Sequence, residues 1–134
     1  MHIQSYLFFE GRCDEALEFY RAALGAEVTE LVRYKDNPDP GGCAPDMADK
    51  VMHCSFRVGD TVVWASDGRC TGQPKFHGFS QAITVSTEAE AGRIFTALSG
   101  GGQVLAPPAK SFFSPFFGMT YDRFGVLWMV LVGE

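Results

Sequence analysis

The stretch GDTVVWAS, residues 59–66, has a counterpart in FGVLWMVL, residues 124–131, and this pair decides the fold that we expect for the 134-residue chain. Both stretches combine a glycine turn with an apolar run, and a shift of one residue between them places Trp64 opposite Trp128. A second pair agrees, because EFYRAALGAEV (residues 18–28) matches RIFTALSGGGQV (residues 93–104) with one inserted residue. Agreement in element order, helix stop and Trp position indicates a duplicated module.

Apolar spacing predicts the same order of elements in each half: strand, helix, strand, strand, strand. Gly25 is a good stop for the first helix, and Thr87 with Glu90 forms a capping box that opens the second. The predicted elements of the first half are 3–9, 13–24, 26–34, 51–58 and 61–66. Those of the second half are 79–85, a helix from 87 to the glycines at 100–102, 103–106, 116–121 and 126–132.

The predicted fold class is α+β, with two β-α-β-β-β modules that form one curved, mixed-sheet cup and carry their helices outside. The first module covers residues 1–68, the second covers 77–133, and the polar, glycine-rich segment 69–76 links them. A chain of this length buries enough surface for a core without disulfides. A cup of eight strands has room for one small ligand.

The composition narrows the classes of partner. The chain carries a formal net charge of −5 and a pI of about 5.1, which disfavours nucleic acid and anionic membranes. None of the four cysteines, Cys13, Cys43, Cys54 and Cys70, forms a C-x-x-C pair, and buried or unpaired thiols are expected. No signal peptide or membrane-spanning run is apparent, so we expect a cytoplasmic protein.

One segment differs sharply in composition from the rest. Residues 35–50, KDNPDPGGCAPDMADK, hold three prolines, two glycines and four aspartates, which predicts a long loop. Such a loop is either a surface excursion or a lid over a binding site. The sequence leaves both alternatives open.

Five stretches together resemble the vicinal oxygen chelate superfamily, which includes glyoxalase I, extradiol dioxygenases and bleomycin-resistance proteins, and most closely its PhnB-like (YjdN-like) branch. Members of that branch are often labelled as demethylubiquinone methyltransferases. The matching stretches are YLFFEGRCDEALEFY (6–20), DKVMHCSFRVGD (49–60), WASD (64–67), FFSPFFG (112–118) and DRFGVLWM (122–129).

The resemblance implies four cup-facing positions at which the superfamily's enzymes bind a divalent metal through His, Gln and Glu. Carried over, these positions are Ser5, Ala65, Ser80 and Met129. None of these side chains is a competent ligand for such a metal. A one-residue shift would substitute Gln4 or Tyr6, Trp64 or Ser66, Gln81, and Trp128 or Val130. We therefore expect no metal and, since no glycine-rich nucleotide loop follows a strand, no S-adenosylmethionine or other cofactor.

Two residues are weak candidates for acid–base chemistry. His53 is a candidate because imidazole is the usual side chain for acid–base catalysis near neutral pH, but strand alternation places Cys54, rather than His53, on the face of Ala65. Asp67 either lies at the cup's rim or caps the turn into Gly68, and Asp122 is expected to be structural in the same way. The aromatic run 111–118 is either a pocket wall or packing. The expected ligand-pocket residues are Ser5, Leu7, Cys54, Ala65, Asp67, Ser80, Phe113, Phe116 and Met129.

The sequence thus predicts a homodimeric PhnB-like protein that binds a small, partly apolar molecule without the superfamily metal. A metal-dependent glyoxalase or dioxygenase is the first alternative. A dimeric interaction module without a ligand is the second.

Overall fold

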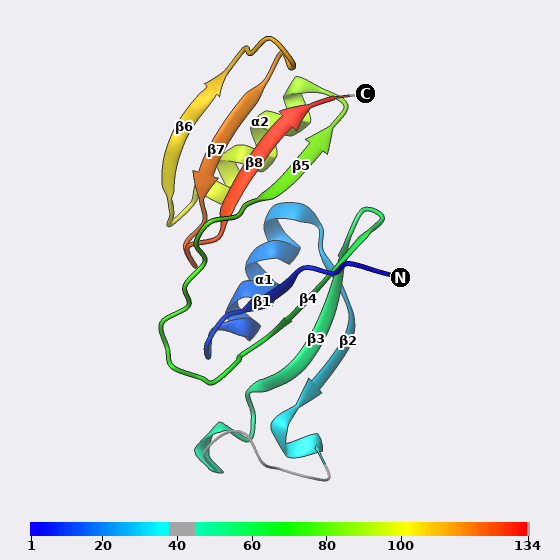
Figure 1. Ribbon diagram of the computed structural model, residues 1–134, viewed down its shortest axis with the longest axis vertical. Helices are drawn as coiled ribbons and strands as arrows, with labels where there is room; N and C mark the ends of the chain where they lie inside the picture. The colour runs from blue at the N-terminus through cyan, green and yellow to red at the C-terminus, as the bar shows by residue number, and fades with distance from the viewer. Residues whose placement is uncertain (38–44, 134) are drawn as a thin grey trace. The chain divides into compact units, whose positions relative to one another are not determined.

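The computed structural model describes residues 1–37 and 45–133 (Figure 1). The chain divides into two compact units, Met1–Pro74 and Lys75–Glu134, and the boundary falls inside the segment predicted as the linker. Within the described residues, each unit packs one α-helix against one four-stranded sheet. The α+β class and the order of elements are those predicted, whereas the joining of the two sheets into one cup stays a prediction.

Unit 1 (residues 1–74) has the strand order β1-β4-β3-β2, with β1 parallel to β4 and the other pairs antiparallel. Its elements are β1 (Tyr6–Phe8), α1 (Cys13–Leu24), β2 (Glu27–Arg33), β3 (Val51–Val58) and β4 (Thr61–Ser66). Short 3₁₀ turns at Tyr34–Asp36 and Pro45–Met47 follow β2 and precede β3. Residues 38–44, the centre of the segment for which a lid was considered, lie outside the described residues.

Helix α1 follows the predicted pattern. Its buried residues, among them Ala16 and Tyr20, form one stripe that faces the sheet. The helix ends at Gly25, whose left-handed φ of 69° lets its N–H donate to the Arg21 carbonyl oxygen.

Unit 2 (residues 75–134) repeats this topology with the order β5-β8-β7-β6. Its elements are β5 (Gln81–Val85), α2 (Glu88–Ser99), β6 (Gln103–Ala109), β7 (Phe117–Tyr121) and β8 (Leu127–Val132). The Thr87 hydroxyl caps α2 by accepting a hydrogen bond from the Glu90 N–H at 3.2 Å, as the capping motif predicts. Strand β6 is longer than expected because it includes Pro107 and Pro108, which an edge strand tolerates.

The strand registers correct the internal alignment by one residue. Ala65 pairs with Leu7 and Cys54, and Val130 pairs in the same way with Ile83 and Gly118. The buried Ala65 is matched here to the buried Val130, so that the exposed Trp64 matches Met129 and not the buried Trp128. The two tryptophans point to opposite faces of their sheets, since Trp64 is 40% exposed and Trp128 only 4%. A one-residue slip moves every side chain to the other face, so this error matters for the site.

In each unit, the helix covers one face of the sheet, and we call the other face the open face. No helix among the described residues is long and apolar enough to cross a membrane.

Candidate functional site

Four aromatic side chains gather on the open face of unit 1. Strand alternation places Tyr6, Phe8, His53 and Trp64 there, because β1, β4 and β3 are neighbours in the sheet. The Tyr6 ring centroid lies 4.8 Å from that of Phe8, 5.5 Å from that of His53 and 6.4 Å from that of Trp64. The Tyr6 hydroxyl and His53 Nδ1 are hydrogen-bonded at 3.0 Å. Tyr6 is therefore the centre of this aromatic cluster.

A pocket of about 410 Å³ opens beside the cluster, within unit 1. We call it the unit 1 pocket. Aromatic and thioether side chains form its apolar part, and charged and hydroxyl groups form its rim. Its lining residues are Tyr6, Phe8, Glu10, Tyr34, Met52, Ser66, Gly68 and Arg69.

Hydrogen bonds fix the rim of the unit 1 pocket. Glu10 Oε2 accepts from the N–H groups of Arg69 at 3.0 Å and Thr71 at 3.3 Å. The Tyr34 hydroxyl donates to the Gly68 carbonyl oxygen at 2.9 Å. Gly68 has a φ of 57°, a conformation that favours glycine, and a Cβ there would lie 2.9 Å from Glu10 Oε1. The rim is thus a bonded structure and not a loose loop.

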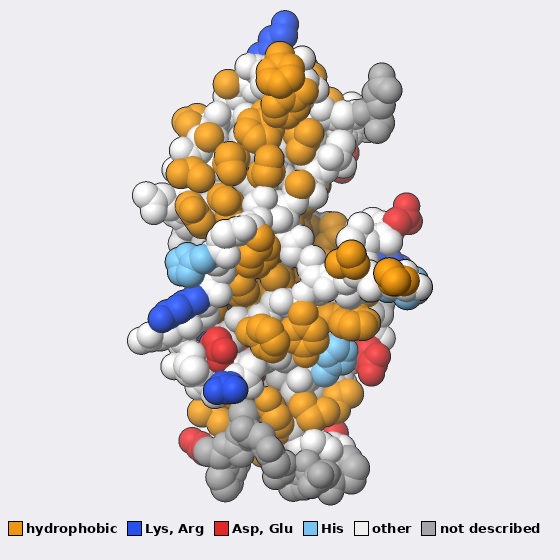
Figure 2. Space-filling view, viewed as in Figure 1, with side chains coloured by type: hydrophobic (Ala, Val, Ile, Leu, Met, Phe, Trp, Pro, Cys, Tyr) orange, Lys and Arg blue, Asp and Glu red, His pale blue; other side chains and the backbone are white. Residues whose placement is uncertain are grey.

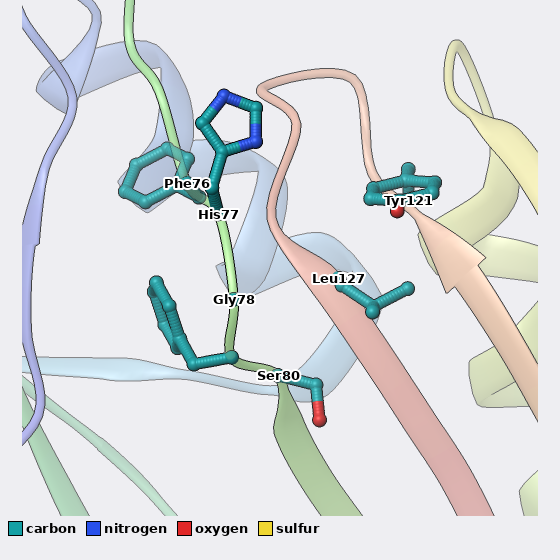
Figure 3. Close-up of a pocket in the computed structure, with 7 residues that line it drawn as sticks. Phe76, His77, Gly78, Ser80, Tyr121 and Leu127 are labelled. Atoms are coloured by element: carbon teal, nitrogen blue, oxygen red, sulfur yellow. The ribbon is translucent and has the colours of Figure 1, made fainter.

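A smaller pocket of about 280 Å³ lies within unit 2. Figure 3 shows that consecutive residues of one extended segment line it, together with Tyr121 and Leu127 of the β7–β8 hairpin. The segment residues are Phe76, His77, Gly78, Phe79 and Ser80. Ser80, a predicted pocket residue, is therefore found at a pocket.

Three of the predicted pocket residues lie on the helix-facing side of the unit 1 sheet. Leu7, Cys54 and Ala65 are at most 1% exposed, and they contribute to the core instead of the open face. Cys54 Sγ lies 3.7 Å from Cys13 Sγ on α1. The hydrogen bond with Cys54, together with burial, raises the pKa of the Cys13 thiol. Ser5 precedes β1 and is exposed, and its carbonyl oxygen accepts from the Trp64 N–H.

Asp67 is also buried, at 0% exposure, instead of lying at a rim. Its carboxylate accepts hydrogen bonds from the N–H groups of Cys13 at 2.7 Å and Val51 at 2.6 Å. It therefore fixes the start of α1 and the start of β3. Asp122 is structural as predicted, since it accepts from the N–H groups of Phe124 and Val126 and from Trp128 Nε1.

The remaining predicted residues of unit 2 separate into two groups. Met129 lies on the open face, and the exposed Phe113 ring packs 5.2 Å from the ring of Phe117. Phe116 instead lies 6.4 Å from Phe95 of α2, between ring centroids, and so belongs with the helix-facing side. The structure therefore does not bring the two predicted phenylalanines to one wall.

The strand positions carried over from the superfamily's metal site hold no imidazole or carboxylate. Ser80 and Met129 are carried-over positions, and Tyr6 and Trp64 lie one residue from the carried-over Ser5 and Ala65. All four side chains are poor donors for divalent metal ions. In the described part of the chain, no group of three or more His, Cys, Asp and Glu side chains is placed to hold a metal ion. The sequence analysis did not include Tyr6, Phe8 and Trp64 among the expected pocket residues. Tyr6 and Phe8 are aromatic residues two positions apart in one strand, and this spacing indicates that both rings lie on the same face.

The sequence profile of a family described as 3-demethylubiquinone-9 3-methyltransferase matches residues 1–131. This chain belongs to that family, the PhnB-like branch of the glyoxalase-fold proteins. Protein YjdN from Escherichia coli K12 is 28% identical over 142 residues, which cover 98% of this chain and 95% of YjdN. The resemblance stated from the sequence is thereby confirmed.

Solved structures agree with this assignment. Protein PA1353 from Pseudomonas aeruginosa is 37% identical, with a TM-score of 0.85 over 98% of this chain and 97% of the other. A putative 3-demethylubiquinone-9 3-methyltransferase, PhnB protein, from Bacillus cereus is 28% identical, with a TM-score of 0.81 over 99% and 100%. A glyoxalase-related enzyme from Fulvimarina pelagi, 15% identical with a TM-score of 0.63 over 99% and 88%, shares the fold.

Proposed function

We propose that this PhnB-like protein binds a small, partly apolar molecule in the unit 1 pocket, without a divalent metal. The observation that carries the proposal is the convergence of Tyr6 and Phe8 with a hydrogen-bonded polar rim around about 410 Å³. Small-molecule sites are typically concave and mostly apolar, with a few placed polar groups. The rings offer flat surfaces, and a planar ligand stacks well on such surfaces.

Two alternative chemistries lack the groups that they need. A metal-dependent glyoxalase or dioxygenase would require imidazole or carboxylate ligands, and the described open-face positions do not provide such a set. A methyltransferase, as the family's description suggests, would use S-adenosylmethionine as the methyl donor. The run Gly100–Gly102 follows the C-terminal end of α2, whereas a nucleotide loop precedes the N-terminus of a helix.

The two tryptophans provide the test. Trp64 is 40% exposed beside Tyr6, and Trp128 is buried in the other unit. We expect planar organic molecules that raise the melting temperature to quench or shift the fluorescence of Trp64. The Trp64→Phe variant should lose this spectral change while keeping the thermal stabilisation. A screen of small aromatic and aliphatic metabolites in which no compound changes either signal would refute the proposal.

A second candidate, an interaction module, rests on the exposed apolar surface of unit 2. Figure 2 shows hydrophobic side chains spread over the region of β5 to β8. Among the large hydrophobic residues of unit 2, those most exposed are Phe112 at 101%, Phe113 at 52% and Leu105 at 52%. Exposed apolar surface of this kind is typical of interfaces. Sedimentation analysis of wild type and Phe113→Ser tests it, since an interface through this surface predicts an oligomer that the substitution weakens.

A further inference from the structure

Arg69 differs from the other arginines of unit 1. Arg12, Arg21, Arg33 and Arg57 each form an ion pair with a carboxylate of the same unit. Within the described residues, the Arg69 guanidinium has no such partner, although the side chain lines the unit 1 pocket. Its five N–H donors are therefore left for solvent or for a ligand in the pocket.

The backbone around Arg69 is strained and tied down. Glu10, with a φ of 53°, and Cys70, with a φ of 58°, are the two non-glycine residues with positive φ in the described ranges 1–37 and 45–133. Both belong to the segments that form this rim. The Gly72 N–H donates to the Glu10 carbonyl oxygen at 2.7 Å, and the Arg69 N–H donates to Glu10 Oε2. Strained backbone that the surrounding bonds hold in place is concentrated at binding and catalytic sites.

The Glu10 carboxylate shares the pocket with Arg69 but does not neutralise it. Its Oε2 atom is bound by two backbone N–H groups, and no ion pair forms between Glu10 and the Arg69 guanidinium. The rim therefore presents one cationic donor group and one carboxylate. A ligand with a single negative charge suits this arrangement, whereas Glu10 would repel the second charge of a dianion.

We propose that Arg69 binds the carboxylate of the ligand while its apolar body packs on Tyr6 and Phe8, so that the ligand class is small aromatic monocarboxylic acids. This inference rests on the proposed function of the unit 1 pocket and adds the chemical class of its ligand. A guanidinium matches a carboxylate through two parallel N–H···O bonds, and it is the preferred group for this recognition.

Matched pairs of probes test the proposal with the full chain. We would titrate 3-phenylpropanoate, indole-3-acetate and 2-naphthoate, and the primary amide of each, by calorimetry. Amide NMR shifts of ¹⁵N-labelled protein would locate binding. A charge-assisted pair with Arg69 should make the protein bind the acid more tightly than its amide. Because Arg69 is exposed to solvent, we expect this difference in affinity to be only about tenfold at low salt. The preference should shrink as salt is added.

Two substitutions assign the preference to Arg69. Arg69→Gln should reduce the acid-to-amide ratio to about one, and Arg69→Lys, which keeps the charge without the planar fork, should give an intermediate ratio. Arg93→Gln is the control, because Arg93 is an exposed arginine on α2 of unit 2. It should leave the ratio unchanged.

The outcomes separate this inference from the proposed function. If acids and amides bind equally with shifts in β1 and residues 68–72, the pocket binds ligands but the carboxylate assignment is wrong. If the Arg69→Gln variant still binds acids more tightly than amides, the carboxylate assignment to Arg69 is also wrong. Absence of binding by every probe at millimolar concentration would overturn both proposals.

Discussion

The two units share one topology but carry different open faces. The strand orders β1-β4-β3-β2 and β5-β8-β7-β6 are equivalent, and each unit pairs its first and last strands in parallel. With Trp64 matched to Met129, the pairings match Tyr6 to Ala82 and His53 to Phe117. Unit 1 thus carries hydrogen-bonding aromatic groups where unit 2 carries apolar side chains. The same topology therefore does not imply the same site.

The buried acids also differ between the units. Asp67 binds backbone groups of α1 and β3, which are distant in sequence, whereas Asp122 binds the turn that follows it and the Trp128 indole. A buried carboxylate that accepts backbone hydrogen bonds therefore connects separate elements in unit 1, whereas in unit 2 it stabilises one hairpin.

The largest expected effect comes from removing these acids. Asp67→Ala leaves the N–H groups of Cys13 and Val51 buried without their acceptor, and it should lower the free energy of unfolding by about 3 kcal/mol. Asp122→Ala should cost a similar amount. Urea denaturation followed by circular dichroism measures both. Losses below about 1 kcal/mol would mean that water or rearrangement replaces these bonds.

Substitution of Gly118 tests how closely α2 packs on the sheet of unit 2. A Cβ at Gly118 would lie 2.7 Å from the Phe95 ring, whereas the equivalent position in unit 1 holds Cys54. Gly118→Ala should therefore destabilise the protein by about 2 kcal/mol through overpacking. Gly92→Ala is the control, because its Cβ would meet nothing closer than 4.0 Å. In the helix interior it should stabilise by about 0.5–1 kcal/mol. Equal effects of the two variants in thermal denaturation would contradict the packing difference.

The smallest expected change in stability comes from removing a polar group from the open face of unit 1. Tyr6→Phe removes the hydroxyl bonded to His53 and should cost about 0.5–1 kcal/mol, since the pair is only partly buried. Tyr121→Phe in unit 2 should change stability by less, because no hydrogen bond of its hydroxyl is observed within the described residues. Paired urea denaturation curves measure the difference. A larger loss at Tyr121 would reverse the proposed contrast between the faces.

Local features of the fold were predictable from the sequence. Apolar spacing located both helices, Gly25 and Thr87 marked their ends, and the β3–β4 hairpin has the predicted bounds. These signals depend on neighbouring residues, so one sequence is enough to read them.

The candidate site was harder to predict because it depends on which face each side chain takes. Carrying a metal-ligand position of the superfamily over to Ala65 put the assumed cup face of unit 1 on Ala65 and on its strand partners Leu7 and Cys54. Strand alternation does not indicate which face of a sheet a helix covers. In β2, the alternation is also interrupted by a register shift between Val28 and Glu30. The bonds of Asp67 to Cys13 and Val51 span 54 and 16 residues, so no local pattern predicts them.

The edge strand β6 has a consequence for how the protein behaves when it is concentrated. Within the described residues, the outer edge of β6 pairs with no strand, and Val104 and Leu105 are exposed. Such an edge is a template on which other chains add strands and aggregate. Pro107 and Pro108 have no N–H group to offer such a strand. Pro107 and Pro108, which β6 includes beyond its expected end, therefore limit the addition of strands from other chains to this edge.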